Sequence, residues 1–194
     1  SSSVHQWSLF PASMHSPQLL KLVNTKITST TVEYLVDLVV DVGTHGFRRT
    51  SSTRPKLQVS KTFVDLVKRV LRAAEITMPT LLVTLVYLER AKTVIEIPED
   101  KMTLERVFLG ALITASKYLN DVTWRNVHWS MFTALFGKND IGHIERQFLQ
   151  VLDYQLRVSE EDILNHYEGV ATPTASHPRK RGSKLPASTS HLRR

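Results

Sequence analysis

The sequence contains no cysteine, and this absence narrows the kinds of site that the protein can carry. Disulfide frameworks, thiolate–zinc sites and cysteine nucleophiles are excluded, and the composition fits a reducing compartment. Long apolar runs are also missing: the most apolar stretch, Met78 to Leu88, is far too short to span a bilayer. Residues 1–18 lack the apolar core of a signal peptide, so we expect no secretory leader.

Sequence motifs of enzymatic chemistry are absent too. None of G-x-G-x-x-G, G-x-x-x-x-G-K-[ST] and G-x-S-x-G occurs, and the eight histidines form no H-E-x-x-H pair. The adjacent acids at 99–100 and 160–162 each lie at an expected helix entrance, where negative charge is favourable. We therefore predict no catalytic residue, no metal site and no cofactor. By elimination, the sequence indicates a protein that works by binding.

A positive net charge is present, and most of it lies near the end of the sequence. The chain carries a formal charge of +7 at pH 7. Residues 170–194 hold six Lys or Arg and no acid, whereas residues 1–169 are nearly balanced. This stretch has too little apolar content to offset the entropy of ordering, so 170–194 is predicted to be a disordered basic tail. Its clustered basic residues are a candidate nuclear localisation signal: Arg179, Lys180, Arg181 and Lys184.

Apolar residues recur with helical spacing, and no segment of useful length alternates with period two, so we predict an all-α fold. Residues 1–28 show no sustained period and are predicted to be mostly irregular. A helix is predicted at 29–43, ended by Gly43, and a basic loop at 44–59. Five packed helices are predicted within 60–157, followed by a short helix at 158–169. Ser60 and Ser159 are expected N-caps, and Gly137 and Gly169 are expected helix ends.

Two charged residues lie beside apolar helix faces. On a helical wheel, Lys117 falls on a second face of its helix, together with Gly110, Ile113 and Thr114. The small residues of that face would let another backbone come close. Glu145 likewise lies within or beside an apolar stripe. Three interpretations stay open: both charges reach out to water, they pair with each other inside the protein, or they form a charged pair at the rim of a protein-binding surface, where they fix register.

Three stretches resemble the landmarks of a cyclin box: "LVYLERAK", "LGALITASKYLNDVTWRN" and "IERQFLQVLDYQL". They occur in the right order within about 60–156 and resemble most closely the fungal PCL group, the cyclins that activate the phosphate-system cyclin-dependent kinase. The resemblance implies a single five-helix cyclin box with one preceding helix and a short following helix. Only 38 residues follow Leu156, so we do not expect a complete second box.

The resemblance also implies a kinase-binding site. In cyclins, the lysine of the motif that reads "ASKYLND" here contacts the kinase beside its C helix, and so does the acid that opens the "E-x-x-F-L" pattern. These positions are Lys117 and Glu145. Gly110, Ile113 and Thr114 belong to the same predicted kinase-binding face.

A structural ion pair is expected as well. Many cyclins pair the acid at the end of the second box helix with an arginine at the start of the first. The acid is Glu89 here, but Ser60 stands at the place of the arginine. The expected partner of Glu89 is therefore the next residue, Lys61.

The implied function is that of a regulatory subunit and not of an enzyme. Such a cyclin binds and activates a cyclin-dependent serine/threonine kinase of the phosphate-system type and helps to select its protein substrates, in the nucleus and cytoplasm and without a membrane. The alternative is a cyclin-like helical domain that binds DNA in transcription, with Arg48, Arg49, Arg54 and the tail supplying phosphate contacts. The Ser-Pro and Thr-Pro dipeptides at Ser16 and Thr172 are candidate phosphorylation sites.

Overall fold

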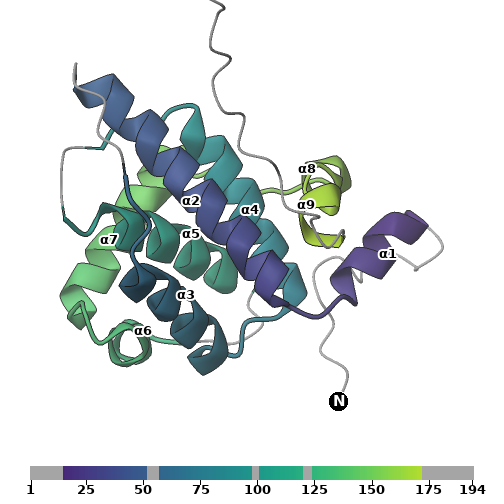
Figure 1. Cartoon of the computed structure of the whole chain (residues 1–194), viewed down its shortest axis with the longest axis horizontal. Helices are drawn as coiled ribbons and strands as arrows, with labels where there is room; N and C mark the ends of the chain where they lie inside the picture. Colours follow the sequence, from purple (N-terminus) through teal and green to yellow (C-terminus); the bar gives the residue numbers. More distant parts are fainter. Residues whose placement is uncertain (1–14, 52–56, 98–100, 120–123, 172–194) are drawn as a thin grey trace, which may run out of the picture.

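The computed structural model describes residues 15–51, 57–97, 101–119 and 124–171, and within these ranges it contains helices and no strand (Figure 1). The predicted all-α fold is therefore confirmed. No helix in the described ranges is long and apolar enough to cross a membrane. The helices are α1 (Pro17–Val23), α2 (Ser29–Thr50), α3 (Lys61–Ala73), α4 (Met78–Lys92), α5 (Thr103–Leu119), α6 (Asn126–Thr133), α7 (Lys138–Val151), α8 (Glu160–Leu164) and α9 (Tyr167–Ala171).

Two helices, α4 and α5, form the centre of the bundle. Buried residues make up 11 of the 15 positions of α4 and 13 of the 17 positions of α5. The helix α5 contacts α2, α3, α4 and α7, and Figure 1 shows α2 crossing in front of α4 and α5. A helix with neighbours on most sides must be apolar on most sides, which explains the weak amphipathicity of α4.

The helix α2 continues seven residues beyond its predicted end. Gly43 and Gly46 lie inside this helix, and side chains from elsewhere in the chain pack closely against both. An added Cβ would lie 2.8 Å from Leu57 at Gly43 and 2.7 Å from Ile97 at Gly46. The prediction that Gly43 ends the helix, and that a loop begins at 44, is therefore wrong. Close packing, and not a left-handed turn, selects glycine here.

The region before α2 contains a helix that the sequence pattern did not predict. The side chain of Ser16 caps α1 by accepting a hydrogen bond from the N–H of Leu19 at 3.2 Å. Leu19 and Leu22 bury its apolar side. The N–H of Ser16 also donates to Glu160 of α8 at 3.0 Å. A helix of seven residues is too short to give a recognisable period, which is why residues 17–23 were expected to be irregular.

Two short helices, α8 and α9, lie where the sequence predicted a single helix at 158–169. The predicted cap of the first is confirmed: Ser159 and Asp162 exchange side-chain to backbone hydrogen bonds of 2.9 and 3.1 Å. Gly169 lies within α9 and not at a helix end, because the ring of Tyr34 on α2 occupies the space where a Cβ would project. This glycine lets α9 approach α2 closely.

The caps around the middle helices agree with expectation at α3 and differ at α6. Ser60 accepts the N–H of Phe63 at 3.1 Å, as predicted for the start of α3. The helix α6 ends earlier than expected, at Thr133, and its C-cap Ala134 has a φ of 52°, in the left-handed region. Gly137 is instead the N-cap of α7, and its N–H donates to Asp140 at 3.1 Å.

Candidate functional site

Lys117 and Glu145 form an ion pair that joins α5 to α7. The ammonium of Lys117 lies 2.6 Å from Oε2 of Glu145, and it also donates to Oδ1 of Asn126, the first residue of α6, at 3.1 Å. The side chains are 36% exposed for Lys117 and 17% exposed for Glu145. Three helices thus meet at one charged cluster that is in contact with solvent. The two charges do not reach into water separately. A pair that serves the fold alone and a pair at the rim of a protein-binding surface both stay open.

The small residues near Lys117 receive α7 and do not face a partner. An added Cβ on Gly110 would lie 2.8 Å from Phe148 of α7, and Ile113 and Thr114 are 0% and 3% exposed. The small residues of this α5 face do let another helix come close, as expected, but that helix is α7 of the same chain. Gly110, Ile113 and Thr114 are therefore corrected from kinase contacts to packing residues of the α5–α7 contact.

An exposed aromatic residue, Tyr154, follows the end of α7, the helix that carries Glu145. Leu149 lies one turn after Glu145 and is half-buried. The N–H of Tyr154 donates to the carbonyl of Leu149 at 2.9 Å, and the Tyr154 side chain is 60% exposed. Sequence reasoning missed Tyr154. The signal was present in the "DYQL" that ends the α7 stretch, but an aromatic residue there is equally typical of the core.

The segment that carries Tyr154 is held by a buried tyrosine. The hydroxyl of Tyr87 on α4 donates to the carbonyl of Leu156 at 2.8 Å, and its ring packs at 6.4 Å from the ring of Tyr118. Burial, followed by the neighbouring Tyr118, raises the pKa of Tyr87 above its ordinary value, so the hydroxyl remains a donor. This hydrogen bond fixes the chain just after Tyr154.

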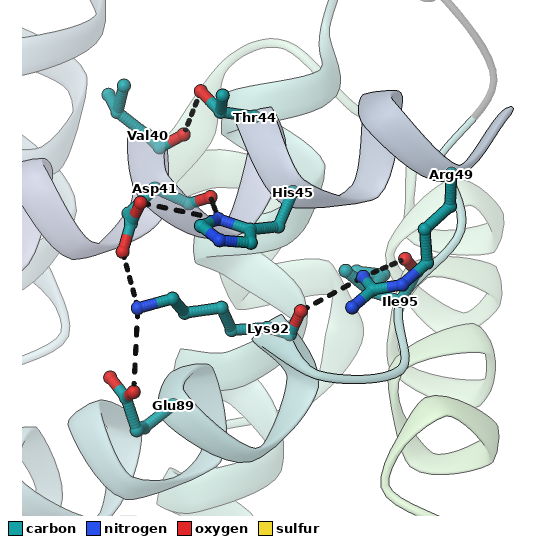
Figure 2. Close-up of polar contacts among 8 residues, drawn as sticks. All are labelled: Val40, Asp41, Thr44, His45, Arg49, Glu89, Lys92 and Ile95. Carbon is teal, nitrogen blue, oxygen red and sulfur yellow. Dashed lines mark hydrogen bonds and ion pairs between the residues drawn. The ribbon is translucent and has the colours of Figure 1, made fainter. Parts of the chain in front are cut away.

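Glu89 pairs with a residue other than the predicted one. Its carboxylate lies 3.6 Å from Lys92 of the same helix, and Lys92 lies 2.6 Å from Asp41 of α2, which also approaches His45 at 3.3 Å (Figure 2). Among the described residues, no ion pair joins Glu89 to the exposed Lys61, so the expected structural pair is not formed. The hydrogen bond that the Lys92 ammonium donates to Asp41 is the main cause that raises the pKa of Lys92, which keeps the ammonium charged.

The end of α4 is closed by an arginine from α2. The guanidinium of Arg49 donates to the carbonyls of Lys92, Thr93 and Ile95 at 3.0, 2.7 and 3.0 Å, two of which Figure 2 shows. Such carbonyls have no partner within a helix and need an external donor. The Arg49 guanidinium, although exposed, is therefore engaged in hydrogen bonds within the chain, which weakens the DNA-binding interpretation in which it contacts phosphate.

The comparison with protein families gives the class of this bundle. The sequence profile of the family described as "Cyclin, N-terminal domain" matches residues 41–157, more than half of the chain. The chain belongs to the cyclin family. The matched residues begin in the second half of α2 and include all of α3 to α7, the five helices that the resemblance assigned to the cyclin box.

Three relatives from Saccharomyces cerevisiae agree with the resemblance to the PCL group. PHO85 cyclin-1 is 30% identical over 167 residues, which cover 82% of this cyclin and 59% of that protein. PHO85 cyclin-2 is 28% identical over 149 residues, 75% of this cyclin and 48% of the relative. PHO85 cyclin-9 is 36% identical over 104 residues, 51% of this cyclin and 34% of the relative. This cyclin therefore spans about a third to three fifths of the length of these relatives.

Of the predicted phosphorylation sites and the predicted localisation signal, only Ser16 lies in the described ranges. Ser16 is the N-cap of α1, with its hydroxyl and its N–H both in hydrogen bonds. Thr172 and the predicted localisation signal lie outside the described residues. Within the described residues, no group of three or more His, Asp or Glu side chains is arranged to hold a metal ion.

Proposed function

We propose that this cyclin binds and activates a cyclin-dependent serine/threonine kinase of the Pho85, or phosphate-system, type and contributes no catalytic atom. The observation that carries the proposal is the Lys117–Glu145 pair. It brings two partly exposed charges from separate helices to within 2.6 Å, at the positions that contact the kinase in cyclins. The relatives support the type of kinase, since each is named a PHO85 cyclin.

The pair is organised before any partner arrives. An ammonium group has three donors, and Glu145 and Asn126 accept two from Lys117, which leaves one for the kinase. Of the Glu145 carboxylate, only Oε2 takes part in the described contacts, so Oε1 can accept a further hydrogen bond. Because three helices fix these side chains, docking costs less conformational entropy than it would for free side chains.

This geometry suggests how the cyclin activates its partner. A protein kinase orients ATP only when the glutamate of its C helix pairs with the ATP-binding lysine. In the proposed complex, Lys117 and Glu145 form hydrogen bonds to the kinase beside its C helix and fix the docking register. The exposed apolar surface of Leu149 and Tyr154 supplies contact area. Binding then shifts the kinase toward the state with the C helix held inward.

The same proposal includes substrate selection and a location in both nucleus and cytoplasm. Its support is the basic cluster from Arg179 to Lys184, the kind of segment that import receptors recognise. Fluorescence microscopy of the tagged chain, with and without these basic residues, tests the location.

Co-purification with a Pho85-type kinase tests the kinase assignment. The double variant Lys117→Ala/Glu145→Ala removes both charges together, so that neither remains without its partner. We expect its affinity for the kinase to fall at least tenfold, with a matching loss of kinase activity on a peptide substrate. The control Lys21→Ala/Glu33→Ala removes the same two charge types from exposed positions on α1 and α2. Unchanged binding by the first variant, with equal thermal unfolding midpoints for both, would refute the assignment.

A further inference from the structure

The outer side of α6 carries apolar side chains that the fold does not cover. Val127, Met131 and the following Leu135 are 46%, 70% and 46% exposed, whereas Trp129 and Thr133 of the same helix are fully buried. The buried pair faces α3 and α7, which α6 contacts. Val127 and Met131 lie one turn apart on α6, Leu135 follows just after the helix, and exposed apolar side chains that gather in this way mark candidate interaction surfaces. We call these three residues the α6 patch.

Three basic residues lie near the α6 patch. The sequence from Trp124 to Lys138 contains no acid, and its two lysine or arginine residues, Arg125 and Lys138, are both exposed. From α3, the guanidinium of Arg69 reaches the last turn of α6 and donates to the carbonyls of Phe132 and Thr133 at 3.3 and 2.7 Å. Cationic groups thus lie before, after and beside an apolar centre.

One described acid lies close to this basic rim. Asp140, just beyond Lys138, is used at the start of α7, where it accepts the N–H of Gly137. A negative charge in that place is stabilised by the helix terminus, and its hydrogen bond directs it toward α7. The α6 patch therefore combines apolar side chains with a rim in which Arg69, Arg125 and Lys138 outnumber Asp140.

We propose that the α6 patch and its basic rim dock an acidic amphipathic peptide segment of a protein partner. The apolar side chains of the segment would cover Val127, Met131 and Leu135, and its carboxylates would meet Arg69, Arg125 and Lys138. An apolar centre with a charged rim is the usual anatomy of a protein–protein interface. Nucleic acid would use the basic rim but would leave the apolar centre uncovered, so the composition of the patch favours a peptide.

The patch lies next to the charged cluster and is distinct from it. Asn126, the first residue of α6, accepts a hydrogen bond from Lys117, but the α6 patch begins one residue later and includes none of Lys117, Glu145 and Tyr154. A segment bound there would be held close to the partner of that cluster. The inference does not require the proposed kinase function.

Peptide selection tests the proposal directly. A phage-displayed library of random twelve-residue peptides is selected against the full chain, and enriched peptides are synthesised with a fluorescent label and titrated by anisotropy. We expect enriched peptides that combine Asp or Glu with large apolar residues. We expect Arg125→Glu/Lys138→Glu and Met131→Ser each to weaken their binding at least tenfold. The matched controls are Lys21→Glu on α1 and Val94→Ser, an apolar residue 56% exposed after α4.

Each other outcome counts against the proposal. Enrichment of neutral or basic peptides, no enrichment, or equal binding to the variants and controls would overturn it. A labelled twelve-base-pair DNA duplex that binds the chain better than the acidic peptides, and loses binding in the charge-reversal variant, would assign the surface to nucleic acid instead. Loss of kinase co-purification by these variants would make the α6 patch part of the kinase interface. Failure of the Lys117/Glu145 test alone leaves this inference intact.

Discussion

The hydroxyl of Tyr34 on α2 lies 2.8 Å from Nδ1 of His166, a residue only 4% exposed in the short segment between α8 and α9. This hydrogen bond ties the C-terminal helices to α2. The charged groups facing the same small hollow are Glu89 and Arg90 from α4 and Asp162 from α8. Burial is the main cause that lowers the pKa of His166, and the carboxylates of Glu89 and Asp162 oppose it.

The first prediction is that His166 makes the stability depend on pH. Because its folded-state pKa lies below the ordinary value of 6.5, the unfolded chain binds the proton more readily. Stability should therefore be fully present above pH 6.5 and fall as the pH drops below it. The variant His166→Asn keeps a polar atom near the position of Nδ1 but cannot bind the proton. In urea denaturation, its free energy of unfolding should fall less between pH 7.5 and pH 5.5 than that of the wild type.

The control for this comparison is His143→Asn, at an exposed position of α7. It should leave the difference between the two pH values as in the wild type. An equal or larger loss in His166→Asn would show that other groups cause the pH dependence.

The second prediction is that Gly110→Ala destabilises the protein although alanine is the better helix former. The propensity gain is about 1 kcal/mol. The added Cβ would lie 2.8 Å from Phe148, and overpacking of a close contact typically costs about 1–3 kcal/mol. The site is fully enclosed between α5 and α7, so we expect a net loss in the free energy of unfolding, measured by urea denaturation.

Gly142→Ala is the matched control, since Gly142 also lies inside a helix. The atoms nearest to its added Cβ are ends of side chains, Nδ2 of Asn126 at 3.0 Å and a guanidinium nitrogen of Arg146 at 3.3 Å, which can move aside. This variant should be clearly less destabilised than Gly110→Ala. The reverse order would mean that α5 and α7 are not packed as closely as the structure shows.

The third prediction concerns the closure of α4 by Arg49. Arg49→Met removes three hydrogen bonds to backbone carbonyls, and we expect a loss of about 1–2 kcal/mol in the free energy of unfolding, because part of the contact is open to water. Arg49→Lys should recover only part of the loss, since an ammonium cannot reproduce the planar fork.

Arg48→Met is the control within the same turn, because Arg48 is exposed and carries the same charge toward the end of α2. It should change the stability little. If both variants lost the same amount, charge at the helix end and not the hydrogen bonds of Arg49 would be the cause.

Features with a local physical cause were predictable from the sequence. The amphipathic period of α3 and the caps at Ser60 and Ser159 depend on residues within one or two turns, and the structure confirms them. Lys117 and Glu145 were recognisable because each is a charge beside an apolar stripe. The seven-residue α1 was not predictable, because its stability comes from burying Leu19 and Leu22 and from the hydrogen bond between Ser16 and α8.

Glycine shows most clearly where local reasoning fails. Gly43, Gly46 and Gly110 all lie within helices, and the first was mistaken for a helix end. The physical reason is that each faces a side chain from elsewhere in the chain, Leu57, Ile97 or Phe148, which an added Cβ would approach to less than 3.0 Å. A glycine that ends a helix and a glycine that admits a neighbour look alike in the sequence.

The sequence by itself determined the helical class, the positions of the five box helices and the two charges that mark the candidate site. The tertiary structure alone decided which groups meet. Lys117 forms an ion pair with Glu145, which lies 28 positions further along the chain. Glu89 pairs with Lys92, which also pairs with Asp41 of α2, and the predicted partner Lys61 takes no part. Helix period and caps arise from neighbours along the chain, whereas ion pairs and close packing depend on how α2, α5 and α7 come together, and no local pattern encodes that approach.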